Sequence, residues 1–425
     1  MRIFFLLAAL AVAASGETHR LTIRQAVDRA VDQNSEVVMA RLDEIKAAQA
    51  IRIAKDPFYT RIIGGSGFAY NYGYPLSIEG SAPSIFQTNA SRYILNRPQS
   101  WAVAQAKETA RGAGLAVGEK RDEIAWRVAT MFVDVERIGR FMEMLQKQVE
   151  SLGNVYDAVD ARVRLGHELP VAKQEAYVNL LRVQQKLMNL ESDRDYAGHD
   201  LAAALGYGAA DTVEPAPAER APLPIPPTED AALKAALDAS KELKRLQSTY
   251  EAKGLEIKGD RAQRLPRVDL VAQYALLSQY SNYDQYFLKF QRNNAEIGAS
   301  VQIPILGGPG VKAQIAQAEA DRQRIQAEIA AERDRIALDV HHSFQDLIKA
   351  NAASQLAKAE VDLAHAQLSV LLAQMKEGRA SPRQVEDARS VEDEKSLALY
   401  DAQFSDARAR LEILRQTGQL LETLK

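Results

Sequence analysis

An apolar repeat with a period of 3.5 residues runs through residues 124–163 and constrains the fold more than any other feature of this sequence. Its apolar side chains are spaced four and three residues apart in strict alternation, and a helix with this spacing buries its seam by supercoiling left-handedly around a partner. Residues 311–336 repeat the spacing less regularly. We therefore predict long helices over about 98–163 and 311–376, each roughly 100 Å long at about 1.5 Å per residue. The first repeat consists of Ile124, Val128, Met131, Val135, Ile138, Met142, Leu145, Val149, Leu152, Tyr156, Val159 and Val163.

The same turn sequence follows both predicted long helices. Residues 161–176 and 373–388 align without gaps, and each contains a glycine four residues before a proline. Gly166 and Gly378 can take the left-handed conformation that ends a helix, while Pro170 and Pro382 suit the first position of the next helix. The sequence therefore predicts two long helical hairpins with similar tips, at 166–170 and 378–382.

The duplication extends to the rest of the chain. Residues 25–31 correspond to 231–237, and the same offset carries Phe68 onto Tyr274. The order helix, helix, strand, strand, long helix, long helix is thus expected twice. We expect the first repeat over 17–210 and the second over 229–425. The six prolines of residues 211–228 predict an extended connector between them.

Composition bounds the class of protein. The 425 residues carry a net charge of −3 and are 47% hydrophobic, which indicates a large folded body and gives no electrostatic reason to expect nucleic acid. Residues 1–16 combine one basic residue, an apolar run and a small-residue end, so they predict a secretory signal peptide cut after Ala14 or Gly16. No later segment is apolar enough for a membrane-spanning helix. Cysteine is absent, so no disulfide or lipid-bearing cysteine supports the exported chain.

Four segments show the alternation of strands, over about 61–74, 85–95, 267–277 and 294–304, and the alternation is weaker over 85–95. Segments of about ten residues with one apolar and one polar face are typical of transmembrane β-barrels, in which aromatic residues gather at the membrane interface. A small soluble sheet is the alternative. Four strands cannot close a barrel, and lipid tolerates no open strand edge, so closure would need eight strands from a dimer or twelve from a trimer. The expected interface aromatics are Phe68, Tyr70, Tyr72, Tyr74 and Tyr274.

No pattern in the sequence indicates catalysis or a cofactor. His341 and His342 are adjacent, so on a helix they point about 100° apart and lack the i, i+4 geometry of a metal pair. No phosphate loop, nucleophile and base, or metal-ligand cluster stands out. We therefore expect neither an enzyme nor a metal site.

Together these features resemble the TolC-like outer membrane efflux factor family over the whole expected mature chain. The resemblance rests on residues 21–31 (LTIRQAVDRAV), residues 301–318 (VQIPILGGPGVKAQIAQA) and the two Gly-x-x-x-Pro tips. It implies a mainly α fold with a transmembrane β-barrel part, in which three duplicated chains form a twelve-stranded barrel continued by a periplasmic α-helical tunnel. The trimer comes from the resemblance alone.

The resemblance also implies a function and its residues. The expected protein is the outer membrane exit duct of a tripartite efflux or type I secretion system, passing substrates from an inner-membrane transporter and a periplasmic adaptor to the exterior. Gln384 and Asp387 fall at the periplasmic aperture, where three Asp387 carboxylates would favour cations. A soluble periplasmic coiled-coil interaction protein is the alternative. The expected adaptor-docking positions are Arg164, Gly166, Pro170, Lys376, Gly378, Ser381 and Pro382.

Overall fold

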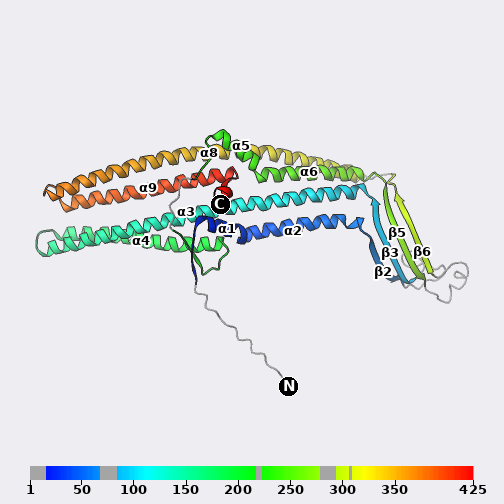
Figure 1. Ribbon diagram of the computed structural model, residues 1–425, viewed down its shortest axis with the longest axis horizontal. Coiled ribbons are helices and arrows are strands. Elements are labelled where there is room, and N and C mark those ends of the chain that lie inside the picture. Colours follow the sequence, from blue (N-terminus) through cyan, green and yellow to red (C-terminus); the bar gives the residue numbers. More distant parts are fainter. Residues whose placement is uncertain (1–15, 68–83, 217–222, 278–292, 306–308, 425) are drawn as a thin grey trace, which may run out of the picture. The chain divides into compact units, whose positions relative to one another are not determined.

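A computed structural model of the chain contains two compact units, which we describe separately (Figure 1). Unit 1 consists of Met1–Met39, Gly118–Ser240 and Arg333–Lys425, and unit 2 of Ala40–Val117 and Lys241–Glu332. The structure describes residues 16–67, 84–216, 223–277, 293–305 and 309–424. The expected signal peptide lies outside this part of the chain, apart from Gly16. Each unit contains segments from both halves of the sequence, so the two repeats contribute jointly to each unit.

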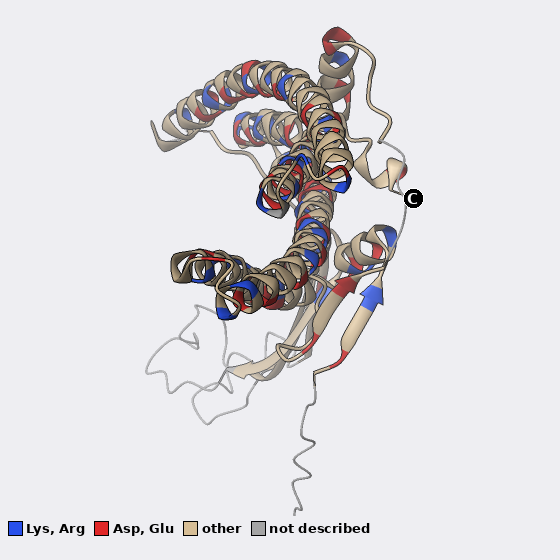
Figure 2. Ribbon diagram, turned by 90° about the vertical axis from the view of Figure 1, so that its left-hand side faces the viewer, with Lys and Arg blue, Asp and Glu red and all other residues tan. Residues whose placement is uncertain are grey.

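The two long hairpins have equal helix lengths. Helices α3 (Arg97–Arg164) and α8 (Pro309–Lys376) each contain 68 residues, and α4 (Pro170–Ala204) and α9 (Pro382–Gln416) each contain 35. Figure 1 shows α3 turning into α4 and α8 turning into α9. The long helices expected over 98–163 and 311–376 lie within α3 and α8. Charged residues of both signs are interspersed along these helices (Figure 2), as expected for solvated coiled-coil surfaces.

Shorter elements complete unit 1. Strand β1 (Thr18–Leu21) pairs in parallel with β4 (Thr212–Pro215). Helices α1 (Ile23–Gln33), α5 (Glu229–Ala239) and α10 (Leu420–Thr423) pack beside the long helices. Strand β1 and helix α1 begin the first repeat, β4 follows its end, α5 begins the second repeat and α10 follows α9. Unit 1 therefore joins distant parts of the sequence.

The core of unit 1 explains the apolar repeat of α3. Its buried seam runs from Ile124 to Leu145, whereas its continuation from Val149 to Val163 is only half-buried. Near the tip, α3 therefore retains apolar surface that this chain does not fully cover. The largest fully buried side chains of the main core cluster are Phe132, Ile124, Leu201, Leu205, Leu411, Leu414 and Leu420.

Helix α2 (Ser35–Lys55) begins in unit 1 and continues from Ala40 in unit 2. Unit 2 also contains the short 3-10 helix η1 (Asp56–Phe58), α6 (Lys241–Ala262) and the first parts of α3 and α8. Polar contacts join its helices. Gln105 Nε2 of α3 donates to Glu256 Oε2 of α6 at 2.9 Å, and Lys253 Nζ lies 3.2 Å from Asp321 Oδ2 of α8. The second hairpin is thus tied to α6 within the same unit.

A four-stranded antiparallel sheet also lies in unit 2. Its strands are β2 (Arg61–Gly67), β3 (Ser84–Leu95), β5 (Arg267–Leu277) and β6 (Asn293–Gln302), in the order β2-β3-β5-β6. The expected strands over 85–95, 267–277 and 294–304 coincide with β3, β5 and β6 to within two residues at each end. The segment expected over 61–74 is a strand up to Gly67, and residues 68–74 lie outside the described residues. Within the described residues, β2 and β6 each have only one paired edge.

The strand register separates the sheet into two chemically different faces. Leu270 is paired with Ala299, and Ala272 with Ile297, so these side chains share one face. The alternate positions are mostly polar, although Ile63, Val271 and Ala275 also lie on that face. The alternation of β3 is weaker because Thr88 and Arg92 lie on the same face as Phe86 and Ala90. Its register also shifts between Ser84 and Phe86 and between Tyr93 and Leu95, and the second shift places Leu95 beside Val268. The polar face includes Gln87, Asn89, Ser91, Asp269, Gln273, Glu296 and Ser300.

Candidate functional site: the hairpin tips

Both hairpins turn through the same backbone motif. Gly166 and Gly378 each have φ of 74°, in the left-handed region that favours glycine. In the first turn, the N–H of Gly166 donates to Val163 O at 3.0 Å and that of His167 to Arg162 O at 2.9 Å. The second turn repeats this pair of bonds, at 3.0 and 2.8 Å, from Gly378 and the following residue. These are Schellman motifs, so the paired glycines predicted from the sequence do end the two long helices.

The helices that follow the turns begin differently. Ser381 Oγ accepts from the N–H of Gln384 at 3.3 Å, and Gln384 Oε1 accepts from the N–H of Ser381 at 2.8 Å. This reciprocal capping box satisfies two backbone donors at the start of α9. Leu169 occupies the same position before α4 and makes no side-chain cap. Pro170 and Pro382 both lie at the first position of their helices, as predicted.

The first tip exposes apolar side chains. Leu165, Leu169 and Val171 are 70%, 73% and 64% exposed. Its charges lie just behind the turn, where Asp160 is 2.5 Å from Arg164 Nη2 and 2.6 Å from Lys173 Nζ. The hydrogen bond from Lys173, together with the charge of Arg164, lowers the pKa of Asp160. The first tip is thus an apolar end on a charge-paired base.

The second tip exposes charged and polar side chains instead. Arg379 lies 3.3 Å from Glu377, and Arg383 lies 3.2 Å from Glu175 of α4. Further from the tip, burial raises the pKa of Asp393 on α9, and the charge of Glu392 adds to this effect. Lys376 is the last residue of α8. The two tips therefore differ in their exposed chemistry, although their backbones agree.

A groove lies beside the second tip, between α8 and α9. It encloses about 650 Å³, and both expected aperture residues, Gln384 and Asp387, line it. Both side chains are exposed and lie on the same face of α9, three residues apart. The groove therefore combines polar and apolar lining residues. The remaining lining residues are Ala366, Gln367, Val370, Leu371, Gln374, Ala388 and Val391.

Polar contacts tie the two hairpins together within unit 1. Ser151 Oγ of α3 donates to Glu386 Oε1 of α9 at 3.4 Å and accepts from Arg389 Nη1 at 3.3 Å. Farther from the tips, Arg137 pairs with Asp134 at 2.7 Å and with Asp401 of α9 at 3.4 Å. These residues were not among those predicted from the sequence, since the partners on α3 and α9 are separated by more than 200 residues.

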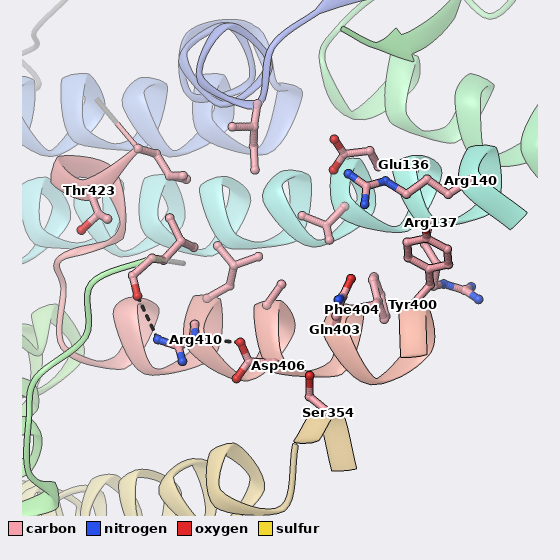
Figure 3. Close-up of a pocket in the computed structure, with 16 residues that line it drawn as sticks. Glu136, Arg137, Arg140, Ser354, Tyr400, Gln403, Phe404, Asp406, Arg410 and Thr423 are labelled. Carbon is pink, nitrogen blue, oxygen red and sulfur yellow. Dashed lines mark hydrogen bonds and ion pairs between the residues drawn. The ribbon is translucent and has the colours of Figure 1, made fainter. Parts of the chain in front are cut away.

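A cavity of about 720 Å³ lies between α3 and α9 in unit 1 (Figure 3). The guanidinium of Arg137 lies 5.0 Å from the Phe404 ring centroid, and Arg410 Nε donates to Asp406 Oδ2 at 2.8 Å. Arg410 also donates to the carbonyl of Leu223 at 3.2 Å. Because Arg137 and Arg410 already have acidic partners, we interpret the cavity as part of the packing between the hairpins.

Of the expected interface aromatics, only Tyr274 belongs to the described residues. It lies on β5 with its ring 6.4 Å from that of Phe86 on β3, and both rings are partly exposed on the face that also carries Leu270. Phe68, Tyr70, Tyr72 and Tyr74 lie outside the described part of the chain. The aromatic girdle therefore stays a prediction.

The described residues offer little for other kinds of site. No group of three or more His, Cys, Asp or Glu residues in this part of the chain is placed to hold a metal ion. Among the helices in the same ranges, none is long and apolar enough to cross a bilayer. His341 and His342 instead lie near single carboxylates, Glu229 at 2.9 Å and Asp346 at 3.0 Å.

The fold with two equal helical hairpins and a four-stranded antiparallel sheet is similar to that of solved structures described as an outer membrane protein and an outer membrane channel. The chain matches a membrane protein from Pseudomonas aeruginosa with a TM-score of 0.77 at 15% identity, over 95% of this chain and 91% of that one. It matches VceC of Vibrio cholerae with a TM-score of 0.74 at 16% identity, over 93% and 96% of the two chains. It matches CmeC of Campylobacter jejuni with a TM-score of 0.77 at 13% identity, over 93% of this chain and 85% of that one. Neither a protein-family model nor a curated protein sequence matches the chain.

Proposed function

We propose that this protein is the outer membrane exit duct of a tripartite efflux or type I secretion system. The observation that carries the proposal is the likeness of fold over 93% or more of the chain to proteins described as outer membrane channels, among them CmeC and the open-state MtrE of Neisseria gonorrhoeae. The duct is passive: an inner-membrane transporter supplies the energy and a periplasmic adaptor connects the two. The soluble coiled-coil alternative gains no support from these likenesses.

The sheet supports membrane insertion as part of a barrel. Its apolar face and its polar face suit lipid and a water-filled lumen, respectively. With β2 at one edge and β6 at the other, copies of the chain can pair edge to edge. Three copies supply the twelve strands that the resemblance implies. In this arrangement the partly exposed Tyr274 lies on the lipid side.

Exposed apolar seams support assembly of the helical part. Leu356, Leu363 and Val370 of α8 are exposed and seven residues apart, so they form one apolar row on a face that this chain leaves open. Helix α4 exposes Leu181 and Met188, also seven residues apart. We infer that α4 of one copy covers α8 of the next. A head-to-tail contact generates a closed ring when the rotation between copies closes, and we propose a ring of three with its tunnel in the periplasm.

The tips supply the periplasmic end of the duct. The proposed aperture consists of Gln384 and Asp387 from each copy, with three carboxylates near the axis that attract cations. The proposed adaptor-docking surface combines the apolar first tip with the charged second tip. The backbone of Gly166 and Gly378 then holds both tips in fixed turns, while Arg164 and Lys376 lie at the ends of the preceding helices.

Cell fractionation tests the location, and electrophoresis tests the assembly. We expect the protein in the outer membrane, soluble only in detergent, and migrating as a trimer before heating. Recovery of monomer in the soluble periplasm would exclude the exit duct. This experiment does not depend on knowing the transported substrate.

Crosslinking tests the adaptor contact. Because the sequence has no cysteine, one introduced cysteine gives a unique attachment point. Leu169→Cys at the first tip should capture a periplasmic adaptor together with its inner-membrane transporter. Ser192→Cys, exposed on α4 and 23 positions along the chain from Leu169, is the matched control and should not. Equal capture from both positions would contradict docking at the tip.

A further inference from the structure

The start of the described chain is held by one acidic side chain. The backbone nitrogen of Glu17 donates to Asp211 Oδ1 at 3.0 Å, and the carbonyl of Glu17 accepts from the N–H of Thr212 at 3.1 Å. Pairing of β1 with β4 begins at the next residue, where Thr18 is opposite Thr212. Residue 17 is therefore the point at which the chain enters unit 1.

Asp211 is arranged to receive positive charge. Its second carboxylate oxygen accepts from the N–H of Gly208 at 3.0 Å. These two backbone hydrogen bonds lower the pKa of the carboxyl, and the bond from Glu17 has the larger effect. Within the described residues, no lysine or arginine forms an ion pair with Asp211, although His19 and His199 lie near enough to lower its pKa slightly further. The carboxylate is thus ionised at neutral pH and is directed at the Glu17 nitrogen.

The residue before Glu17 has no room for a side chain. A Cβ built on Gly16 would overlap the carbonyl of Ala210. The sequence at this point, Ala14-Ser15-Gly16, also has the small residues at alternate positions that a signal peptidase requires before its cut.

We propose that the leader is cleaved between Gly16 and Glu17, and that the α-ammonium of Glu17 formed by this cut pairs with Asp211 and fixes β1 beside β4. Hydrolysis adds one water across the peptide bond. The new carboxylate leaves with Gly16, and the nitrogen of Glu17 becomes an amine that takes up a proton at neutral pH. A neutral peptide N–H that donates to the ionised Asp211 carboxylate is thereby replaced by a charged ammonium, so the hydrogen bond becomes an ion pair.

The strand fixed in this way connects several elements of unit 1. The His19 ring stacks on Tyr207 with centroids 4.0 Å apart, and Arg29 of α1 lies 3.8 Å from the same ring. Arg20 lies 3.3 Å from Glu214, which also pairs with Arg194 of α4. Cleavage thus completes a set of contacts that joins the start of the first repeat to its end. The proposal requires export but is independent of the exit-duct function.

Mass spectrometry of the N-terminal peptide tests the position of the cut. Protein expressed from the full sequence and isolated from the cell envelope should begin at Glu17. A mature chain beginning at Ser15, the product of cleavage after Ala14, would overturn the proposal, as would one that retains the leader. The result is the same whether or not the protein proves to be a channel.

Acylation of the α-amine tests the ion pair. A carboxylate that raises the amine pKa by one unit leaves about tenfold less free amine at pH 7. We therefore expect the folded protein to be acylated at Glu17 about tenfold more slowly than its Asp211→Asn variant. Asp195→Asn, which removes a carboxylate that is 76% exposed and 3.6 Å from His199, is the matched control and should leave the rate unchanged.

A second variant keeps Asp211 and moves the amine. A leader cut two residues earlier gives a chain that starts at Ser15, with an ordinary peptide nitrogen at Glu17. Its terminal amine should react at the faster rate of Asp211→Asn, and adding Asp211→Asn should change that rate no further. Equal rates in the normal and the extended chain would overturn the ion pair, even if Asp211→Asn itself failed to fold.

Discussion

At the first tip, Leu165, Leu169 and Val171 present apolar surface, whereas the second tip presents Arg379 and Arg383 on a turn with the same φ of 74° at its glycine. The backbone of a tight turn depends on a few positions, because only they need glycine, proline or a capping oxygen. The other positions are free to differ. The comparison shows that duplication has preserved the geometry of the turn while the exposed chemistry has diverged.

The largest stability effect should come from the feature that the tips share. Gly166→Ala and Gly378→Ala should each reduce the stability of the local hairpin by about 1–2 kcal/mol, since a left-handed conformation is unfavourable for alanine. The two losses should be equal, because a Cβ at either position meets no atom within 4 Å. Hydrogen exchange of the amides flanking each turn measures them.

Gly153→Ala provides a control for this pair. Gly153 lies within α3, also with no atom within 4 Å of a new Cβ, and without a positive φ. Alanine should stabilise the helix there by about 1 kcal/mol. Clearly unequal losses of stability in Gly166→Ala and Gly378→Ala would show that the two turns are not equivalent in backbone conformation.

The next effect should separate the tips by function. Asp387→Ala should lower the preference for cations in bilayer recordings by roughly tenfold, the ratio that about 1.4 kcal/mol of lost attraction produces. Glu175, the aligned position in the first copy, is the matched control, and Glu175→Ala should leave the reversal potential nearly unchanged. Unchanged potentials in Asp387→Ala would remove this residue from the aperture.

The helix caps allow the comparison to be reversed. Ser381→Ala should destabilise the start of α9 by about 1 kcal/mol, because it removes the side-chain oxygen that accepts from the N–H of Gln384. Leu169→Ser combined with Ala172→Gln should build the same capping box before α4 and stabilise it by about the same amount. Amide exchange at the first turn of each helix measures both changes. A loss at α4 would mean that Leu169 stabilises its turn by packing.

A smaller effect is expected from the ion pair between the tips. Arg383 and Glu175 are 3.2 Å apart, but their side chains are 75% and 52% exposed, so solvent screens the pair. A double-mutant cycle of Arg383→Gln and Glu175→Gln should give about 0.2–1 kcal/mol at low salt and less at high salt. A larger, salt-independent coupling would show that the tips are joined more firmly than this contact accounts for.

Acid should affect the two hairpins in opposite directions. The pKa of Asp160 is lowered in the folded state, so its stabilisation is present above its unfolded pKa and is lost as pH falls through the folded one. The pKa of Asp393 is raised, so its contribution is present below the unfolded pKa and is lost as pH rises through the folded value. Asp160→Asn and Asp393→Asn should each remove the corresponding pH dependence from amide exchange in its own hairpin. If amide exchange depended on pH in the same way in both variants, these assignments would be contradicted.

Local sequence patterns predicted much of this fold. Glycine and proline act within a few residues, so the sequence alone places the two turns, and the heptads indicate which face of α3 is buried. The β3 segment is harder to predict, because Thr88 and Arg92 interrupt its apolar alternation and a bulge near each end shifts its register against β5. Such a bulge depends on the partner strand, which periodicity within one segment does not reveal.

Contacts between distant residues could not be predicted in the same way. Arg137 meets Asp401, and Ser151 meets Glu386, only because α3 and α9 pack together in unit 1. Both helices carry many charged residues, so the sequence offers no reason to select these pairs. The candidate aperture residues came from the family resemblance, and the structure adds that they share one groove.

The equal lengths of the paired helices restrict how this protein can change in size. One inserted residue would rotate everything beyond it by about 100° around the helix axis and move the apolar seam away from its partner. Seven residues would restore the seam and lengthen a helix by about 10 Å. To keep both tips at one level, α3, α4, α8 and α9 would each need the same insertion. A longer or shorter form should therefore differ by whole heptads placed at matching positions in all four helices.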